Sequence, residues 1–290
     1  MLYEVTHRTA YSYTSEVTLS HHLAHLQPRT LPHQELLDFH LEISPEPQSI
    51  HHRINFHETP TSFFSIVQPH TQLIVTARSR VRVVSPILPT SSPPWESVRL
   101  ACSGSLLTDA TITGEFRFDS PHVTRNPDYA DYAATAFPPG QPLLDGLRNL
   151  TAQMHRDFHF DPLATTVATP LADFFQNRRG VCQDFAHFGI ACLRSLGLPA
   201  RYVSGYLETL PPPGKTRLVG ADASHAWISA WSPDFGWIDA DPTNHLFPED
   251  RHITVAWGRD FSDVSPLRGV VIGGGEPQMT VAVDVAPLSA

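Results

Sequence analysis

The sequence predicts an α+β protein with a strand-rich first part and a mixed second part. Residues 1–84 contain period-two and β-branched runs such as LYEVTHRTAYSY and QLIVTARSRVRVV, which favour a β-sandwich or barrel-like domain. Residues 85–95 are rich in proline and serine, as is typical of a semi-extended linker. After this linker the apolar pattern changes from strand spacing to helical spacing, as the leucines between positions 143 and 154 show, within residues 96–290. We therefore expect a second, helix-containing domain over 96–290 that ends in C-terminal strands.

Length and charge exclude several classes of protein. A chain of 290 residues exceeds the usual domain size of about 100–200 residues, which favours two domains. The net charge of −9, without clustered lysine or arginine, argues against a nucleic-acid-binding surface. No window approaches the ~20 apolar residues of a membrane helix, and the first residues lack the pattern of a signal peptide. We expect a cytoplasmic protein with no membrane contact; the oligomeric state is not indicated.

The three cysteines are expected to be free thiols. On one helix, Cys182 and Cys192 would stand about 15 Å apart, at a rise of about 1.5 Å per residue, which is too far for a disulfide.

The segment GVCQDFAHFGIACLRSLGLPA, residues 180–200, predicts a helix with a reactive residue at its start. Its apolar positions form one stripe that includes Cys192, and Gly197 and Pro199 end the helix. Cys182 then lies at the helix N-terminus, where backbone N–H groups and the helix dipole favour a thiolate and can receive an oxyanion. Cys192, on the apolar stripe, is expected to be buried and inert.

A predicted hairpin brings a histidine and an aspartate together. The strand HAWISAW leads through the turn SPDFG into the strand WIDA. A turn centred on Asp234 sets Trp231 opposite Trp237, which places Asp241 one diagonal step from His225 on the same face, roughly 7–8 Å between Cα atoms. Asp239 lies on that face too, but a further step away. Asp241 is therefore the better partner for His225.

Cys182, His225 and Asp241 supply the groups that acyl transfer at an amide requires. A thiolate attacks the amide carbon, an imidazole protonates the leaving amine, and a carboxylate fixes the tautomer of the ring. Each residue also has a structural interpretation. Most free cysteines are small buried hydrophobes, any one of 17 histidines is more often structural, and an aspartate before proline often starts a turn.

Four motifs in order resemble the core of bacterial transglutaminase-like proteins: NRRGVCQDFAHF, RYVSGY, ASHAWISAW and GWIDADPTN. The family's thiol, imidazole and carboxylate fall at Cys182, His225 and Asp241. YEVTHRTAYSY and LQPR resemble the family's N-terminal β domain, and VAWGRDFSDVSPLRGVVIGGG resembles its C-terminal segment. The resemblance implies a papain-like core, in which the helix bearing the cysteine packs on an antiparallel sheet.

The groups that stabilise the oxyanion are left open by the sequence. The backbone N–H of Cys182 is the default donor, and Gln183, Tyr206 and Trp227 are side-chain candidates. Each of the three is equally often a packing or strand-face residue. His187 is a rival base, but five residues along the helix it projects to a different side from Cys182.

No metal or cofactor is expected. The pairs His21–His22 and His51–His52 have no accompanying ligand spacing, and adjacent strand residues face opposite ways. No EF-hand pattern indicates calcium.

The leading hypothesis is hydrolysis of a peptide, isopeptide or γ-glutamyl amide through a cysteine thioester, with a peptide or protein amide as the substrate. The alternatives are a protein-glutamine transglutaminase that joins an amine to glutamine, or a catalytically silent module that binds peptide or carbohydrate. An arylamine N-acetyltransferase shares the chemistry, but HAW together with DPTN favours the transglutaminase-like branch.

Overall fold

The structure of the chain is a computed structural model and describes residues 1–103, 113–209 and 224–288. Its strands are β1 (Leu2–Ala24), β2 (Gln34–Ser44), β3 (Ser49–Ile54), β4 (Pro60–Ile66), β5 (His70–Val83), β6 (His159–Phe160), β7 (Arg179–Gly180), β8 (Ala200–Leu207), β9 (Ser224–Ser232), β10 (Gly236–Ala240), β11 (His252–Gly258), β12 (Leu267–Gly273) and β13 (Pro277–Pro287). Its helices are α1 (Trp95–Ser103), the 3₁₀ helix η1 (Glu115–Arg117), α3 (Pro127–Ala134), α4 (Leu143–Asp157), α5 (Leu171–Asn177), α6 (Cys182–Ser195) and α7 (Phe261–Val264).

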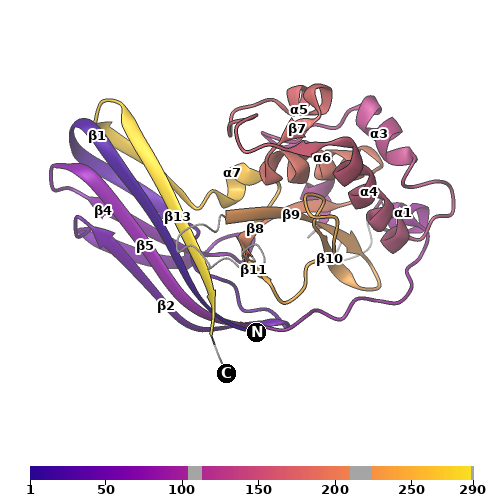
Figure 1. Cartoon of the computed structure of the whole chain (residues 1–290), viewed down its shortest axis with the longest axis horizontal. Helices are drawn as coiled ribbons and strands as arrows, with labels where there is room; N and C mark the ends of the chain where they lie inside the picture. Colours follow the sequence, from indigo (N-terminus) through magenta and orange to yellow (C-terminus); the bar gives the residue numbers. More distant parts are fainter. Residues whose placement is uncertain (104–112, 210–223, 289–290) are drawn as a thin grey trace, which may run out of the picture.

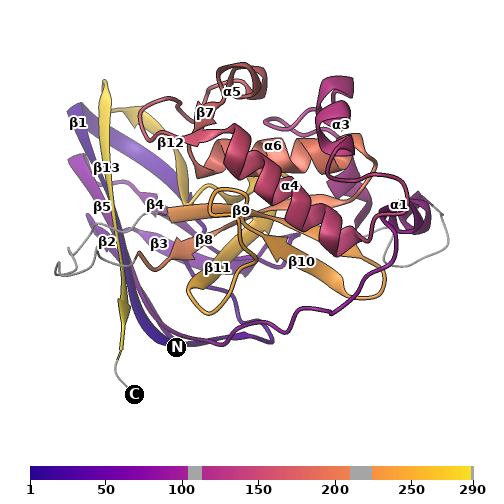
Figure 2. The same cartoon turned by 45° about the vertical axis from the view of Figure 1, so that its right-hand side comes forward.

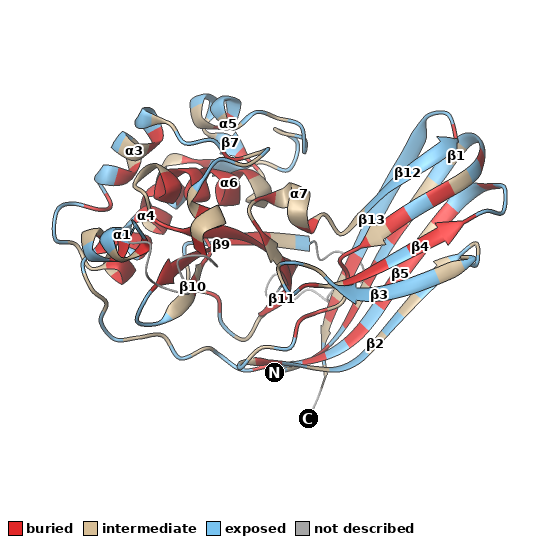
Figure 3. Ribbon diagram, turned by 180° about the vertical axis from the view of Figure 1, so that it is seen from behind, coloured by how far each residue is buried: buried red, intermediate tan, exposed pale blue. Residues whose placement is uncertain are grey.

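The first five strands belong to one seven-stranded antiparallel sheet, here called the N-terminal sheet, with the order β2-β5-β1-β4-β3. β1 is its central strand and runs for 23 residues. Buried and exposed residues alternate along much of β1 and β5, which agrees with the period-two pattern of the sequence (Figure 3).

The last two strands of the chain complete this sheet. β12 and β13 both pair with β1, so that Ala24 stands opposite Leu267 and Val5 opposite Val285 (Figure 1). The prediction that the C-terminal strands belong to the second domain, 96–290, is therefore wrong for these strands. Their pairing supplies hydrogen-bond partners to the free edge of β1, a requirement that no local sequence pattern reveals.

The second half of the chain forms a four-stranded antiparallel sheet, here called the core sheet, with the order β10-β9-β8-β11. Helix α6 packs on β8 and β9, and α3, α4 and α5 contact α6 in turn (Figure 2). The helix approaches β9 closely at Gly189, where a Cβ would lie 3.3 Å from the side chain of Ile228.

One apolar core joins the two halves. Phe185 and Phe188 of α6 belong to the same buried cluster as Tyr3 and Val285 of the N-terminal sheet. The strand-rich first part and the mixed second part confirm the predicted α+β class, with its cysteine helix on an antiparallel sheet. None of the helices in the described residues is long and apolar enough to cross a membrane.

Candidate active site

Cys182 is the first residue of α6, as the sequence predicts. The helix start is fixed by Asp184, whose Oδ2 accepts hydrogen bonds from the backbone N–H of Val181 at 2.8 Å and from the hydroxyl of Thr165 at 2.6 Å. Cys182 itself is half-buried. A thiol in this position stands at the positive end of the helix dipole and remains accessible from the adjoining cavity.

His225 reaches Asp241 across the predicted hairpin. Trp231 pairs with Trp237 as expected, which puts Asp241 diagonally across from His225 just beyond the end of β10. The Nε2 of His225 lies 2.7 Å from the Oδ2 of Asp241. Asp239 is engaged elsewhere, because its Oδ2 accepts the indole N–H of Trp227 at 2.9 Å. The geometry therefore joins His225 to Asp241 rather than to Asp239.

A glycine makes room for this hairpin. Gly205 of β8 stands opposite His225, and a Cβ there would lie 2.6 Å from the ring of Trp227 and 2.1 Å from the carbonyl oxygen of Ile253. Both contacts are shorter than a carbon atom tolerates, so the glycine of the RYVSGY motif permits β8 to lie between β9 and β11 at this level.

Asp241 is fully buried and is surrounded by donors. Its Oδ1 accepts the backbone N–H groups of Thr243 at 3.0 Å and Asn244 at 3.1 Å. Its Oδ2 accepts the Asn244 side-chain amide at 2.7 Å and contacts the Nε2 of His252 at 3.2 Å, in addition to His225. Burial alone would raise the pKa of Asp241, but the hydrogen bonds from the histidines and Asn244 hold that pKa well below its ordinary value.

The charge of His225 is set by its two neighbours. Burial alone would lower the pKa of the imidazole, but hydrogen bonds to Asp241 and to Cys182 raise the pKa of His225 to about 10. Because Nε2 is engaged by Asp241, Nδ1 is the ring nitrogen left to face the thiol. At neutral pH the site therefore places an imidazolium between a carboxylate and a sulfur atom.

A cavity of about 580 Å³, here called the Cys182 cavity, opens onto the thiol and the imidazole. Gln183 and Tyr202 line it from α6 and β8, and Thr9 of β1 and Met279 of β13 line it from the N-terminal sheet. The N-terminal sheet thus forms one wall of the cavity, a role that the sequence did not indicate.

The three side-chain candidates for oxyanion stabilisation lie in different places. Gln183 lines the Cys182 cavity beside the thiol. The hydroxyl of Tyr206 instead hydrogen-bonds the Nδ1 of His7 at 3.0 Å, and the indole N–H of Trp227 is taken by Asp239. Neither Tyr206 nor Trp227 lines the cavity, so of the three only Gln183 is brought to it.

The remaining cysteines and the rival base do not line the Cys182 cavity. Cys102 and Cys192 are buried, and burial raises the pKa of the Cys102 thiol to about 11 and that of Cys192 well above its ordinary value. All three cysteines are free thiols, as predicted. His187 does not line the Cys182 cavity, and its Nε2 accepts the backbone N–H of Phe261 at 3.2 Å.

The residues that sequence reasoning missed are Asn244, His252, Tyr202 and His7. Asn244 and Tyr202 lie inside quoted motifs, DPTN and RYVSGY, so motif membership could have indicated them. His252 and His7 come from other strands and carry no local signal among the 17 histidines.

Histidine pairs at positions 21–22 and 51–52 do not assemble a ligand cluster. The Nδ1 of His21 contacts the hydroxyl of Ser65 and that of His52 contacts Ser62. In the described part of the chain, the group of His, Cys, Asp and Glu with metal-ligand spacing is His225, Asp241 and His252, whose ligand atoms lie within 4.8 Å of one another. These atoms are already engaged in the hydrogen bonds given above.

A cysteine-bearing helix packed on an antiparallel sheet, beside a strand-rich N-terminal domain, is the fold expected of the transglutaminase-like class. Residues 3–82 match the bacterial transglutaminase-like N-terminal region, and residues 130–242 match the transglutaminase-like superfamily. The chain belongs to the bacterial transglutaminase-like proteins.

Similarity to other proteins covers nearly the whole chain. An uncharacterized protein of Mycobacterium tuberculosis is 41% identical over 98% of this chain and 92% of its own length. A protein-glutamine gamma-glutamyltransferase of Pseudomonas aeruginosa is 37% identical over 108 residues, which are 34% of this chain and 16% of that protein. A Cytophaga hutchinsonii crystal structure, described as that of a candidate cysteine protease, has a TM-score of 0.76 at 22% identity and covers 100% of this chain and 91% of that one.

Proposed function

We propose that the protein is a thiol hydrolase that cleaves a peptide, isopeptide or γ-glutamyl amide through a thioester on Cys182. The observation that carries the proposal is the 2.7 Å contact between His225 and the buried carboxylate of Asp241, with Cys182 hydrogen-bonded to the same imidazole. A histidine held in this way can stabilise a thiolate and then give its proton to a leaving group.

The proposed reaction has two steps. The Cys182 thiolate attacks the amide carbonyl carbon, and the resulting oxyanion is stabilised by donors at the helix start and by Gln183. His225 gives its Nδ1 proton to the amide nitrogen, the C–N bond breaks, and the amine leaves. His225, now neutral, takes a proton from water, which attacks the thioester. The C–S bond breaks, the acid leaves, and the thiolate and imidazolium return.

Asp241 acts on the imidazole and not on the substrate. Its hydrogen bond with Nε2 keeps the ring oriented with Nδ1 toward the sulfur, and its charge offsets that of the imidazolium. The wall from the N-terminal sheet limits access to the thioester, since Thr9 and Met279 line the Cys182 cavity.

Amine transfer is the second candidate. It is favoured by the 108-residue match to the Pseudomonas aeruginosa protein-glutamine gamma-glutamyltransferase, which spans about a third of this chain. Both reactions share the thioester and differ in whether water or a primary amine attacks it.

A substrate panel tests the proposal. Peptide, isopeptide and γ-glutamyl amides are incubated with the intact protein and with Cys182→Ala, with and without a labelled primary amine. We expect release of amine or ammonia that is lost in Cys182→Ala and no incorporation of label. Incorporation into a glutamine substrate would favour transfer, and equal turnover by Cys182→Ala would refute a thioester. Binding of a peptide or carbohydrate without turnover would favour the silent module.

A further inference from the structure

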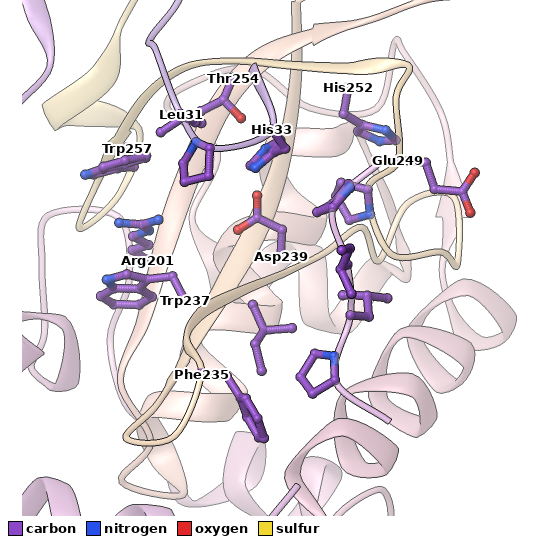
Figure 4. A pocket seen from close by; sticks show the side chains of 17 residues that line it. Leu31, His33, Arg201, Phe235, Trp237, Asp239, Glu249, His252, Thr254 and Trp257 are labelled. Atoms are coloured by element: carbon purple, nitrogen blue, oxygen red, sulfur yellow. The ribbon is translucent and has the colours of Figure 1, made fainter. Parts of the chain in front are cut away.

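A second cavity lies on the other side of β8 from the thiol. It measures about 450 Å³ and is here called the Arg201 cavity (Figure 4). Arg201 and Tyr202 are consecutive in β8, so their side chains point to opposite faces. Tyr202 lines the Cys182 cavity and Arg201 lines this one. A ligand here would therefore not compete for the thiol.

The cavity holds a buried cation that has no hydrogen-bond or ion-pair partner in the described part of the chain, although the charge of Asp239 acts on it. Arg201 is 7% exposed, and its Cζ lies 3.7 Å from the ring centroid of Trp257 and 4.2 Å from that of Trp237. Its Nε is buried and bonds to none of the described residues. Burial lowers the pKa of Arg201 to about 9, which leaves the guanidinium charged at neutral pH. Since both faces of the guanidinium are covered by indoles, an anion can reach it only at its edge.

His252 presents a second unsatisfied atom to the same cavity. It is 4% exposed, and its Nε2 contacts the Oδ2 of Asp241 at 3.2 Å. A carboxylate accepts hydrogen bonds, so Nε2 carries a proton and Nδ1 is the ring nitrogen left for another partner. That Nδ1 is buried and has no partner in the described part of the chain. A buried nitrogen of this kind calls for a hydrogen-bonding group from a ligand.

The rest of the lining is mainly apolar, and its further polar groups include the carboxylates of Asp239 and Glu249. Leu88, Phe235 and Ile238 contribute apolar surface, and Asp239 faces the cavity between Arg201 and His252 in Figure 4. An anionic group, an N–H group and an apolar side chain are the groups that would fit Arg201, His252 and the apolar lining.

We propose that the Arg201 cavity binds an N-acyl amino acid with an apolar side chain, as a free molecule or as the last residue of a short peptide. Its carboxylate pairs with the edge of the Arg201 guanidinium, its amide N–H donates to the Nδ1 of His252, and its side chain packs against Phe235 and Ile238. The carboxylate distinguishes this ligand from an amide substrate at Cys182.

The test uses the full chain carrying Cys182→Ala, which has no nucleophile, so that binding is measured without turnover and the result does not depend on the proposed reaction. Calorimetric titration compares N-acetyl-leucine with N-acetyl-leucinamide, which differ only in the carboxylate. We expect saturable binding of the acid and at least about tenfold weaker binding of the amide, since a charge-assisted hydrogen bond is worth about 1.5–3 kcal/mol.

Three variants in the same background locate the site. Arg201→Met keeps an unbranched chain between the indoles but removes the charge, and Phe235→Asp places a negative charge on a residue that is already exposed. Both are expected to weaken binding of N-acetyl-leucine at least about tenfold. Met279→Asp is the matched control, because Met279 is exposed and lies in the wall of the Cys182 cavity. This variant is expected to leave the affinity for N-acetyl-leucine unchanged.

Either of two results would overturn the proposal: no saturable binding at about 10 mM probe, or equal binding of acid and amide. Loss of binding in Met279→Asp with none in Phe235→Asp would move the site to the Cys182 cavity and overturn it as well. Phe235→Asp keeps the test valid if Arg201→Met fails to fold.

Discussion

The Oδ2 of Asp241 is shared by two imidazoles, since the Nε2 of His225 lies 2.7 Å away and the Nε2 of His252 lies 3.2 Å away. Both rings present the same nitrogen to one buried oxygen. The arrangement orients His225 with Nδ1 outward to Cys182 and gives the carboxylate enough donors to stay ionised without solvent.

Asp241→Asn should reduce kcat for amide hydrolysis by about 10²–10⁴-fold, because an amide cannot offset the imidazolium and can present the wrong partner to Nε2. Steady-state kinetics of amide hydrolysis measures this change in kcat. Asp239→Asn is the matched control and should stay within about threefold of the wild type, since an asparagine oxygen can still accept the Trp227 indole N–H. A larger effect at position 239 than at 241 would assign the orienting role to the wrong aspartate.

The alkaline limb of the kcat/KM profile should lie near pH 10 in the intact protein, because His225 gives up its proton there and can no longer protonate the leaving amine. Asp241→Asn removes a hydrogen bond and a charge that raise the pKa of His225, so the limb should move to lower pH. An unmoved limb would show that another group sets it.

Stability should also depend on pH through His225. The pKa of its imidazole is about 10 when folded against an ordinary value of 6.5, so the folded state holds the proton more tightly. The resulting stabilisation is complete below about pH 6.5 and is lost as pH rises toward about 10. Thermal unfolding from pH 6 to 10 should therefore show a falling Tm. In His225→Gln the fall should be smaller, and an identical slope would contradict the assignment.

His252→Leu should lower kcat about tenfold and raise the pKa of the Asp241 carboxyl. It removes one of the hydrogen bonds that lower the pKa of Asp241, and a hydrogen bond to a charged group is worth about 1.5–3 kcal/mol. His252→Gln retains a donor and should restore part of both. If the two variants behave alike, His252 acts only through packing.

Tyr206→Phe separates a structural role from an oxyanion role. Its hydroxyl bonds His7 at 3.0 Å, so we expect a loss of about 1–2 kcal/mol in unfolding free energy, measured by denaturant titration. The value of kcat should stay within about twofold. A fall of about 10²–10³ in kcat at unchanged stability would instead restore Tyr206 as an oxyanion donor.

The features that the sequence predicts correctly depend on residues close together in the chain. The helix that begins at Cys182 follows from a stripe of apolar residues, and the choice of Asp241 follows from the register of a hairpin whose turn is only a few residues long. Asp239 could be set aside on register alone because strand positions on one face are spaced by two residues.

The parts that escaped prediction depend on contacts far apart in the chain. β13 pairs with β1 across more than 250 residues, and the sequence of neither strand indicates which strand it pairs with. His252 reaches Asp241 from β11, a strand that lies beside β8 rather than beside the hairpin. Tyr206 was a reasonable oxyanion candidate by residue type, and only the position of His7 shows where its hydroxyl goes.

The most direct test of the account is the mass of the protein after rapid quenching with an activated acyl substrate, a γ-glutamyl or peptidyl p-nitrophenyl ester, followed by digestion. We expect one acyl group on the peptide that contains Cys182 and none on those with Cys102 or Cys192. In His225→Gln the adduct should survive longer, because deacylation lacks its base. Steady amide turnover with no adduct at Cys182, or an adduct confined to another cysteine, would contradict the account.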